Sequence, residues 1–287
     1  MIAADRLTRG DISAADDAAR GAGLEPTGAQ WIEEASAFDV RVPSPDGVEQ
    51  ALLATFPHAD VVVQREDLRR RPVLVADMDS TMITVECIDE LADYAGLRAE
   101  IAEVTERAMR GELAFEAALE ARVALLSGLN EEVIDLCREE RVRITPGADA
   151  LVQTMRANGA WCLLVSGGFD RFATRVAADI GFNESLSNSL CVAHGRLTGA
   201  VAHPILGAAA KKEALLRACA ERGVPVEHAL AVGDGANDIP MLEAAGLGVA
   251  FNAKPAAQAA ADARIVHNDL TALLYAQGYA RKDWVEA

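Results

Sequence analysis

The chain has 287 residues, 51% of them hydrophobic, so it can bury a sizeable core and is not expected to be disordered. Its 27 basic and 44 acidic side chains give a formal net charge of −17, which argues against binding to nucleic acid or to an anionic membrane. An anionic substrate must therefore be attracted locally, by a metal ion and a few well-placed cations.

Cysteine usage and the lack of long apolar runs indicate the cellular context. The five cysteines are scattered without a Cys-x-x-Cys pair, which favours reduced packing residues, and the five histidines show no metal-ligand spacing. The first residues contain no apolar segment typical of a signal peptide, and no run approaches the roughly 18 apolar residues of a membrane span. We therefore expect a reduced, cytoplasmic protein that binds neither nucleic acid nor a membrane.

The sequence of residues 1–70 predicts a small α+β module. The expected elements are a helix over residues 11–22, a strand over 38–42, a helix over 48–56 and a strand over 59–63. This order suggests a βαββαβ-like module that lacks a clear first strand. We nominate no effector site in it, and we expect it to serve in packing or as the contact of a homodimer.

The apolar run Val73-Leu74-Val75-Ala76 predicts a strand that is buried on both faces of a parallel sheet. Asp77 and Asp79 follow it at positions i and i+2, at the edge where open α/β sheets bind ligands. Two carboxylates this close are pushed towards protonation unless a cation neutralises them. A lone Asp-x-Asp most often only caps the next helix, so its meaning depends on the rest of the chain.

Residues 86–143 predict a helical insertion after this first strand. Four short amphipathic helices are expected, over residues 87–94, 99–109, 115–125 and 131–140. They would form a small cap over the strand ends, and a cap that excludes water strengthens electrostatic interactions beneath it.

Two further strands end in polar, glycine-rich segments. The strand expected over residues 161–165 is followed by Ser166-Gly167-Gly168, and the strand over 229–232 by Gly233-Asp234-Gly235-Ala236-Asn237-Asp238. Lys211 and Lys212 open an amphipathic helix between them. Two short strands over 246–250 and 263–266 flank an Ala-rich helix, residues 181–198 suggest a β-hairpin near the sheet edge, and the segment from Tyr275 onward carries little signal. We predict a doubly wound α/β core made of residues 71–85 and 144–287.

These strand ends, in this order and with a lysine between the second and third, resemble the haloacid dehalogenase-like superfamily of phosphotransferases. The run from Asp77 to Glu90, Asp-Met-Asp-Ser-Thr-Met-Ile-Thr-Val-Glu-Cys-Ile-Asp-Glu, looks like the phosphoserine phosphatase branch. The resemblance covers roughly residues 72–270. Residues 1–70 resemble, more weakly, the degenerate ACT-like domain that precedes some bacterial phosphoserine phosphatases.

The resemblance implies a covalent mechanism that depends on Mg²⁺. Asp77 would be the nucleophile that forms an aspartyl-phosphate, and Asp79 the general acid and then the general base. The magnesium ligands would be Asp77, Asp234 and the backbone carbonyl of Asp79. The phosphoryl group would be held by Ser166, Gly167, Lys211 and Asn237.

Two details of this site follow from position along the chain. Lys211 ranks above Lys212 because its spacing after the segment Pro204-Ile205-Leu206 fits the family better. The family often has an acidic residue where Gly207 stands, which leaves the local partners of the lysine open. Asp238 would orient the loop or the metal's waters.

Substrate choice depends on residues of the expected cap. Glu86 suits an ammonium group, Arg122 can grip a carboxylate with two hydrogen bonds, and Met109 and Phe115 would form an apolar wall. Ordinary surface charges are the alternative interpretation of Glu86 and Arg122. The resemblance implies a phosphoserine phosphatase, which releases L-serine and phosphate in the last step of serine biosynthesis.

Two other functions stay open at this point. One is a related phosphatase or phosphotransferase for another small phosphomonoester, such as phosphohomoserine or a sugar phosphate. The other is an amino-acid-binding regulator with a vestigial phosphatase fold. The intact set of Asp77, Asp79, Lys211 and Asp234 argues against the regulator, which would not need all four.

Overall fold

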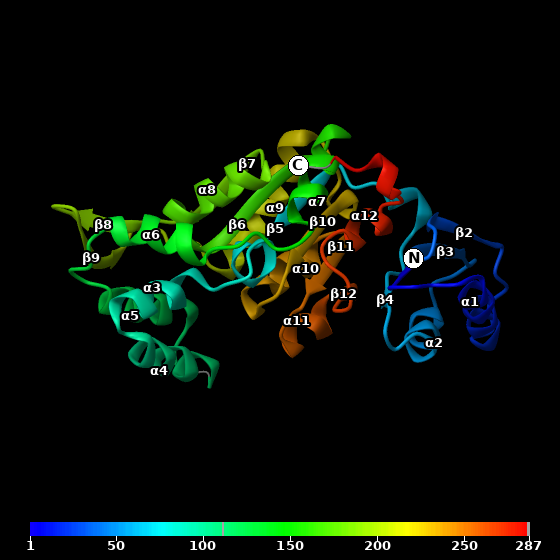
Figure 1. The fold of residues 1–287 in the computed structure, drawn as a ribbon, viewed down its shortest axis with the longest axis horizontal. Coiled ribbons are helices and arrows are strands. Elements are labelled where there is room, and N and C mark those ends of the chain that lie inside the picture. The colour runs from blue at the N-terminus through cyan, green and yellow to red at the C-terminus, as the bar shows by residue number, and fades with distance from the viewer. Residues whose placement is uncertain (111, 286–287) are drawn as a thin grey trace.

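The structure is a computed structural model that describes residues 1–110 and 112–285, apart from the side chain of Met109. Figure 1 shows three regions along the long axis of the molecule. The N-terminal module lies at one end, a group of helices that includes α3, α4 and α5 at the other, and a parallel sheet with its own helices between them. Among the described residues, no helix is both long enough and apolar enough to cross a membrane.

The N-terminal module has the element order βαββαβ. Its elements are β1 (Ile2–Ala3), α1 (Arg9–Gly21), β2 (Gly28–Glu33), β3 (Ala37–Arg41), α2 (Val48–Thr55) and β4 (Asp60–Val61). The strands form one antiparallel sheet in the order β2-β3-β1-β4. The expectation that a clear first strand is missing is therefore wrong: two residues suffice, because Ile2 pairs with both Phe38 and Val61. Strand β2 escaped prediction because its sequence lacks an apolar alternation and none of its residues is fully buried.

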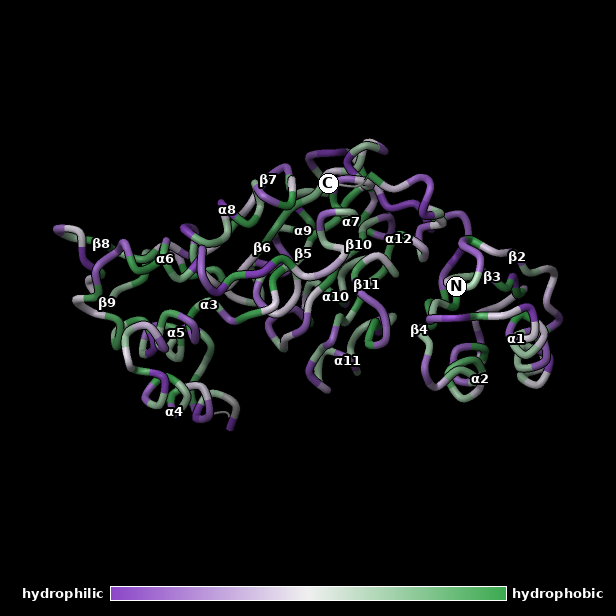
Figure 2. The backbone as a smooth tube through the Cα atoms, viewed as in Figure 1, coloured by the Kyte–Doolittle hydropathy of each residue, from purple (hydrophilic) through white to green (hydrophobic). Residues whose placement is uncertain are grey.

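The core is a six-stranded parallel sheet in the order β12-β11-β10-β5-β6-β7. Its strands are β5 (Val73–Ala76), β6 (Trp161–Phe169), β7 (Glu184–Asn188), β10 (Ala229–Gly233), β11 (Leu247–Phe251) and β12 (Ala263–Ile265). The helices are α7 (Ala148–Ala157), α8 (Asp170–Ile180), α9 (Ala208–Arg222), α10 (Ile239–Ala244), α11 (Pro255–Ala260) and α12 (Ala272–Ala276). Figure 2 shows hydrophobic residues running along the strands of this sheet.

Strand β5 lies between β10 and β6, so both of its faces are covered. Val73 and Val75 pack in one cluster with α9 and α10, whereas Leu74 and Ala76 pack in another with α7 and α8. All four residues are completely buried, which is why the segment carries an unbroken apolar run instead of an alternation. The predicted doubly wound α/β core is confirmed.

Four helices follow β5 before the chain returns to the sheet. They are α3 (Cys87–Ala95), α4 (Arg98–Met109), α5 (Phe115–Leu125) and α6 (Glu132–Arg141), and we call them the cap helices. All four expected helices are present, with bounds that differ by at most one residue. An isolated antiparallel bridge between Ile83 and Ile144 joins the two segments through which the chain leaves and re-enters the core. The exact domain limits, 1–70, 86–143 and the two core segments, stay predictions.

The hairpin expected over residues 181–198 is present, but only its C-terminal part was placed correctly. Residues Glu184–Asn188 form β7, which joins the edge of the parallel sheet beside β6. The hairpin itself is β8 (Leu190–Ala193) with β9 (Arg196–Val201), a separate two-stranded sheet. Strand β9 packs on the cap, because the N–H of Gly128 donates to the carbonyl of Leu197 (2.8 Å) and the N–H of Leu197 donates to that of Leu129 (2.9 Å).

The N-terminal module is fastened to the core through buried polar contacts. The Asp60 carboxylate of β4, only 1% exposed, accepts the backbone N–H groups of Val266 (2.8 Å), His267 (3.1 Å) and Asn268 (2.9 Å). The segment from Tyr275 onward, which carried little signal, also contributes: Tyr275 is buried in a small cluster with Ala3 and Ala37 of the module. The two regions therefore share a packed interface. The ACT-like character of the module and a homodimer through it stay predictions.

Candidate active site

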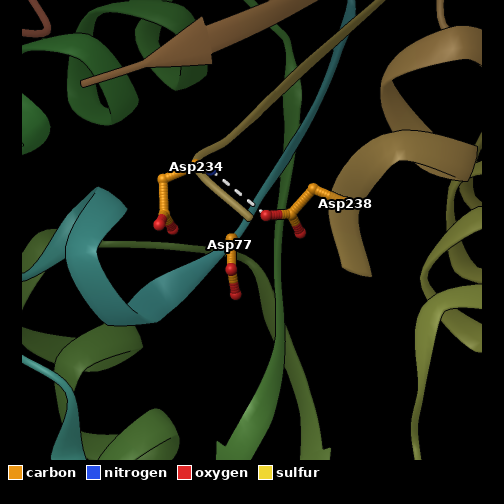
Figure 3. A group of neighbouring side chains, drawn as sticks. All are labelled: Asp77, Asp234 and Asp238. Atoms are coloured by element: carbon orange, nitrogen blue, oxygen red, sulfur yellow. Dashed lines mark hydrogen bonds between the residues drawn. The ribbon is translucent and has the colours of Figure 1, made fainter. Parts of the chain in front are cut away.

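The active-site candidate lies at the carboxyl ends of β5, β6 and β10. The Asp77 N–H donates to the carbonyl of Val232 on β10 (3.0 Å), so Asp77 continues the ladder between the two strands. Strand β6 runs on to Phe169, four residues beyond its predicted end, so Ser166 and Gly167 belong to the strand. Figure 3 shows Asp77 and Asp234 at these neighbouring strand ends, with Asp238 beside them.

The turn after β5 fixes Asp79 by two contacts. One carboxylate oxygen accepts the N–H of Cys87, the first residue of α3, at 2.9 Å, and the other accepts the hydroxyl of Ser166 at 3.3 Å. Ser80, with a φ of 54°, turns the chain back, and its hydroxyl donates to Glu86 (2.7 Å). The predicted acid and base is thus held between the first cap helix and the end of β6.

Lys211 is completely buried and bridges two carboxylates. Its Nζ lies 2.7 Å from Oδ1 of Asp77 and 2.6 Å from Oδ1 of Asp238. The other Asp238 oxygen accepts the N–H groups of Asp234 (3.1 Å, dashed in Figure 3) and Gly235 (2.9 Å). The partners that the sequence left open are therefore Asp77 and Asp238, while Lys212 is exposed. A side chain in place of Gly233 would collide with the Asp238 carboxylate, which explains the glycine there.

The site holds more negative charge than its lysine offsets. Burial, reinforced by Asp238, raises the pKa of Asp77 well above its usual range, although Lys211 opposes the shift. Burial and the nearby Glu86 raise the pKa of Asp79 to about 6, and burial and Asp238 raise the pKa of Asp234 to about 6. Burial alone would lower the pKa of Lys211, but Asp238 and Asp77 together raise it. Such a cluster is stabilised by a further cation.

The carboxylates provide a donor set that suits a hard metal ion. Asp77, Asp234 and Asp238 each offer one oxygen, and these oxygens all lie within 4.8 Å of one another. Both oxygens of Asp238 already bind Lys211 and the backbone, so Asp77 and Asp234 are the freer ligands. An all-oxygen site with surplus negative charge fits Mg²⁺ or a similar cation. The Asp79 side chain, occupied by Cys87 and Ser166, is outside this group.

One cavity of about 470 Å³ joins the strand ends to the cap helices. From the predicted set, the residues that line it are Asp77, Asp79, Glu86, Phe115, Arg122, Gly167, Asp234 and Asn237. Ser166 and Lys211, both fully buried, lie behind its wall instead. The predicted role of Met109 falls on a side chain that lies outside the described residues.

Arg122 and Phe115 bring α5 onto the cavity. The Arg122 Nε donates to the carbonyl of Ala118 (3.2 Å), and the two terminal nitrogens of the guanidinium bind no other described residue. Burial lowers the pKa of Arg122, while Asp89, Glu86 and Asp79 act against the shift. The Phe115 ring lies against the end of β6, since a Cβ on Gly167 would be only 3.0 Å from it. The cap thus contacts the predicted phosphate-binding segment directly.

Comparison with known proteins assigns the family. The model of the haloacid dehalogenase-like hydrolases matches residues 74–243, which include all three strand ends. The chain belongs to this family. The chain is 41% identical to the phosphoserine phosphatase of Streptomyces coelicolor over 98% of its own length and 64% of that protein. It is 44% identical to the phosphoserine phosphatase of Albidiferax ferrireducens, over 70% of its own length and 87% of that protein.

A solved structure extends the likeness to the N-terminal module. A haloacid dehalogenase-family hydrolase from Salmonella enterica superimposes with a TM-score of 0.82 at 27% identity, over 96% of this chain and 97% of that one. The chain thus shares its overall arrangement, N-terminal module included, with a protein of the same family, although it spans less than two thirds of the Streptomyces protein.

Three side chains that sequence reasoning missed also serve the site. The hydroxyl of Thr81 donates to Asp234 (3.3 Å), and the amide of Asn188 donates to the carbonyl of Gly167 (2.9 Å), which fixes the end of β6. Lys254 lines the cavity beside Asp234. Asn188 had no signal, because its segment was taken for a hairpin. Lys254 did have a signal in the sequence, because the chain contains only four lysines and this one closely follows the strand predicted over residues 246–250.

Proposed function

We propose that the protein is a Mg²⁺-dependent phosphoserine phosphatase, which hydrolyses O-phospho-L-serine to L-serine and phosphate in the last step of serine biosynthesis. The observation that carries the proposal is that one cavity is lined both by Asp77 and Asp79 of the core and by Glu86 and Arg122 of the insertion after β5. Relatives named phosphoserine phosphatase at 41% and 44% identity support it. A cytoplasmic location and a homodimer through residues 1–70 are part of the same hypothesis.

Recognition of the amino-acid end would use the cap helices. The two terminal guanidinium nitrogens of Arg122 suit the substrate carboxylate, and Glu86 suits its ammonium group. Phe115 would cover the short methylene arm, with Met109 as its predicted neighbour. A small zwitterion thus finds one opposite charge for each of its own, which a sugar phosphate does not need.

Recognition of the phosphate end would use the core. Asn237 and the backbone of Gly167 line the cavity beside Asp77, so they can hold phosphoryl oxygens. Lys211 and Ser166 would act from behind, Lys211 by neutralising Asp77 and Ser166 by orienting Asp79. The metal would be held by Asp77, Asp234 and the backbone carbonyl of Asp79, and when bound it would offset the negative charge of the phosphoryl oxygens.

The chemistry divides between two carboxyl groups. The Asp77 carboxylate attacks phosphorus, the bond from phosphorus to the serine oxygen breaks, and Asp79 donates a proton to that oxygen. Asp79 then takes a proton from the water that attacks the aspartyl-phosphate, and phosphate leaves. A pKa of about 6 suits both tasks near neutral pH, because the group changes its protonation state at little cost.

Phosphate release from a panel of phosphomonoesters, with and without Mg²⁺, tests the proposal. Phosphoserine should be turned over with a higher kcat/KM than phosphothreonine, phosphohomoserine, phosphoethanolamine or a sugar phosphate, and chelation should abolish turnover. Phosphoethanolamine is the matched probe for Arg122, since it lacks only the carboxylate. A higher kcat/KM for a sugar phosphate, or no Mg²⁺-dependent turnover of any panel member, would refute the assignment.

A further inference from the structure

The cavity must attract a phosphate dianion into a protein whose formal net charge is −17. Four carboxylates line it, from Asp77, Asp79, Glu86 and Asp234. Lys211 does not face it freely, since it is buried between two carboxylates. Among the described residues that line the cavity, the cationic side chains are Arg122 on the cap and Lys254 on the core.

Lys254 is held in place by its backbone and not by its charge. Its N–H donates to the carbonyl of Asp234 (2.9 Å), and its own carbonyl accepts the N–H of Gln258 at the start of α11 (3.0 Å). The Gln258 side chain also donates to the carbonyl of Ala253 (2.6 Å). Lys254 is exposed, and its ammonium has no ion pair with any carboxylate in the described part of the chain.

The position of Lys254 matches the phosphate end of the cavity. Its backbone is bonded to the residue that would bind the metal, and Gly235 and Asn237 of the same loop line the cavity with it. A lysine ammonium on a flexible stem is a mobile point charge that can follow an anion from solvent into a site.

We propose that Lys254 is a phosphate-binding residue of this site, which draws the substrate's phosphate group into the cavity and contacts its non-reacting oxygens until phosphate leaves. The proposal rests on the proposed function insofar as the substrate is a phosphomonoester. It assigns the two lining cations to opposite ends of the substrate, Arg122 to the carboxylate and Lys254 to the phosphate. Because Lys254 is exposed, its contribution should depend on ionic strength.

Three variants of the full chain separate this role from general charge effects. Lys254→Gln removes the charge, Lys254→Arg keeps it, and Lys212→Gln is the matched control, since Lys212 is also exposed and does not line the cavity. For Lys254→Gln we expect kcat/KM for phosphoserine to fall about tenfold at roughly 20 mM salt and about threefold at roughly 300 mM, because screening weakens exposed charges. Lys254→Arg should retain most of the wild-type value, and Lys212→Gln all of it.

Calorimetric titration with inorganic phosphate in the presence of Mg²⁺ gives a second readout that needs no turnover. Lys254→Gln should weaken phosphate binding by a similar factor, with an unchanged melting temperature. Equal phosphate affinity and equal kcat/KM in Lys254→Gln and Lys212→Gln at low salt would overturn the proposal, as would a loss that salt does not reduce and arginine does not restore. If wild-type protein binds phosphate through Lys254 but does not hydrolyse phosphoserine, the proposed function fails and the inference about Lys254 stands.

Discussion

Replacement of Arg122 by alanine separates recognition of the substrate from the chemistry at phosphorus. Within the described part of the chain, the guanidinium makes one hydrogen bond, from Nε to Ala118, and its remaining nitrogens lie in a largely buried setting near Glu86 and Asp89. Removal would leave the substrate carboxylate desolvated and unpaired. The typical loss on removing one partner of a buried charge pair is about 2–4 kcal/mol, or roughly 30- to 800-fold in kcat/KM.

Steady-state kinetics on two substrates measure this effect. With phosphoserine, Arg122→Ala should mainly raise KM. An activated aryl phosphate has no carboxylate, so its kcat/KM should stay close to the wild-type value. Arg98→Ala is the control, since it removes the same charge from an exposed position in the cap, 70% accessible and 3.5 Å from Asp93. Equal losses on the two substrates for Arg122→Ala would mean that the arginine supports the fold or the phosphate site, and recognition of an amino acid would lose its main support.

Four further predictions follow from the site and the interface. Asp77→Asn should reduce turnover to background and yield no acid-trapped phosphoenzyme; substantial turnover without deamidation would refute the covalent mechanism. Mg²⁺ affinity, from activation curves at pH 5 to 8, should fall about tenfold per unit below pH 6, because Asp234, with a pKa of about 6, must lose its proton to bind metal; a flat profile would contradict this. Asp60→Ala should lower the free energy of unfolding by about 3 kcal/mol or more, as measured by denaturation, because buried N–H groups lose their acceptor; an unchanged value would show that water replaces it. A variant that lacks residues 1–70 should keep Mg²⁺-dependent hydrolysis, with reduced solubility where Tyr275 becomes exposed; a folded but inactive protein would show that the module completes the site.

The core and the edge of the site could be predicted because they depend on local patterns. A strand buried on both faces carries an unbroken apolar run, and parallel strands bring their carboxyl ends to one edge, so Asp77 and Asp234 were expected to meet. The position of Lys211 came from resemblance, and its contact with Asp77 is consistent with the role expected for it. The catalytic and binding roles themselves stay predictions.

Features that depend on distant partners had no local signal. The backbone groups bound by Asp60 come from more than 200 residues later in the chain, so Asp60 looked like an ordinary polar residue in a short strand. Strand β7 is a polar edge strand whose pairing with β6 decides its identity, and its sequence alone suggested a hairpin. Asn188 at its end was missed for the same reason, although it fixes Gly167.

The topology keeps reaction and recognition on separate parts of the chain. The groups proposed to act on phosphorus are attached to strand ends whose geometry is fixed by the sheet, and the Lys211 contacts to Asp77 and Asp238 tie two of those ends together. The groups proposed to bind the rest of the substrate come from the insertion after β5, with Glu86 at its start and Arg122 on α5. Changes in α4 or α5 can therefore alter which phosphomonoester fits without moving Asp77. Asp79 is the exception, because its carboxylate accepts the first N–H of α3. A shift of the cap would break that hydrogen bond, so the orientation of the Asp79 carboxylate depends on how the cap packs on the substrate. A phosphomonoester that fits the cap poorly should therefore be hydrolysed with a lower kcat as well as a higher KM.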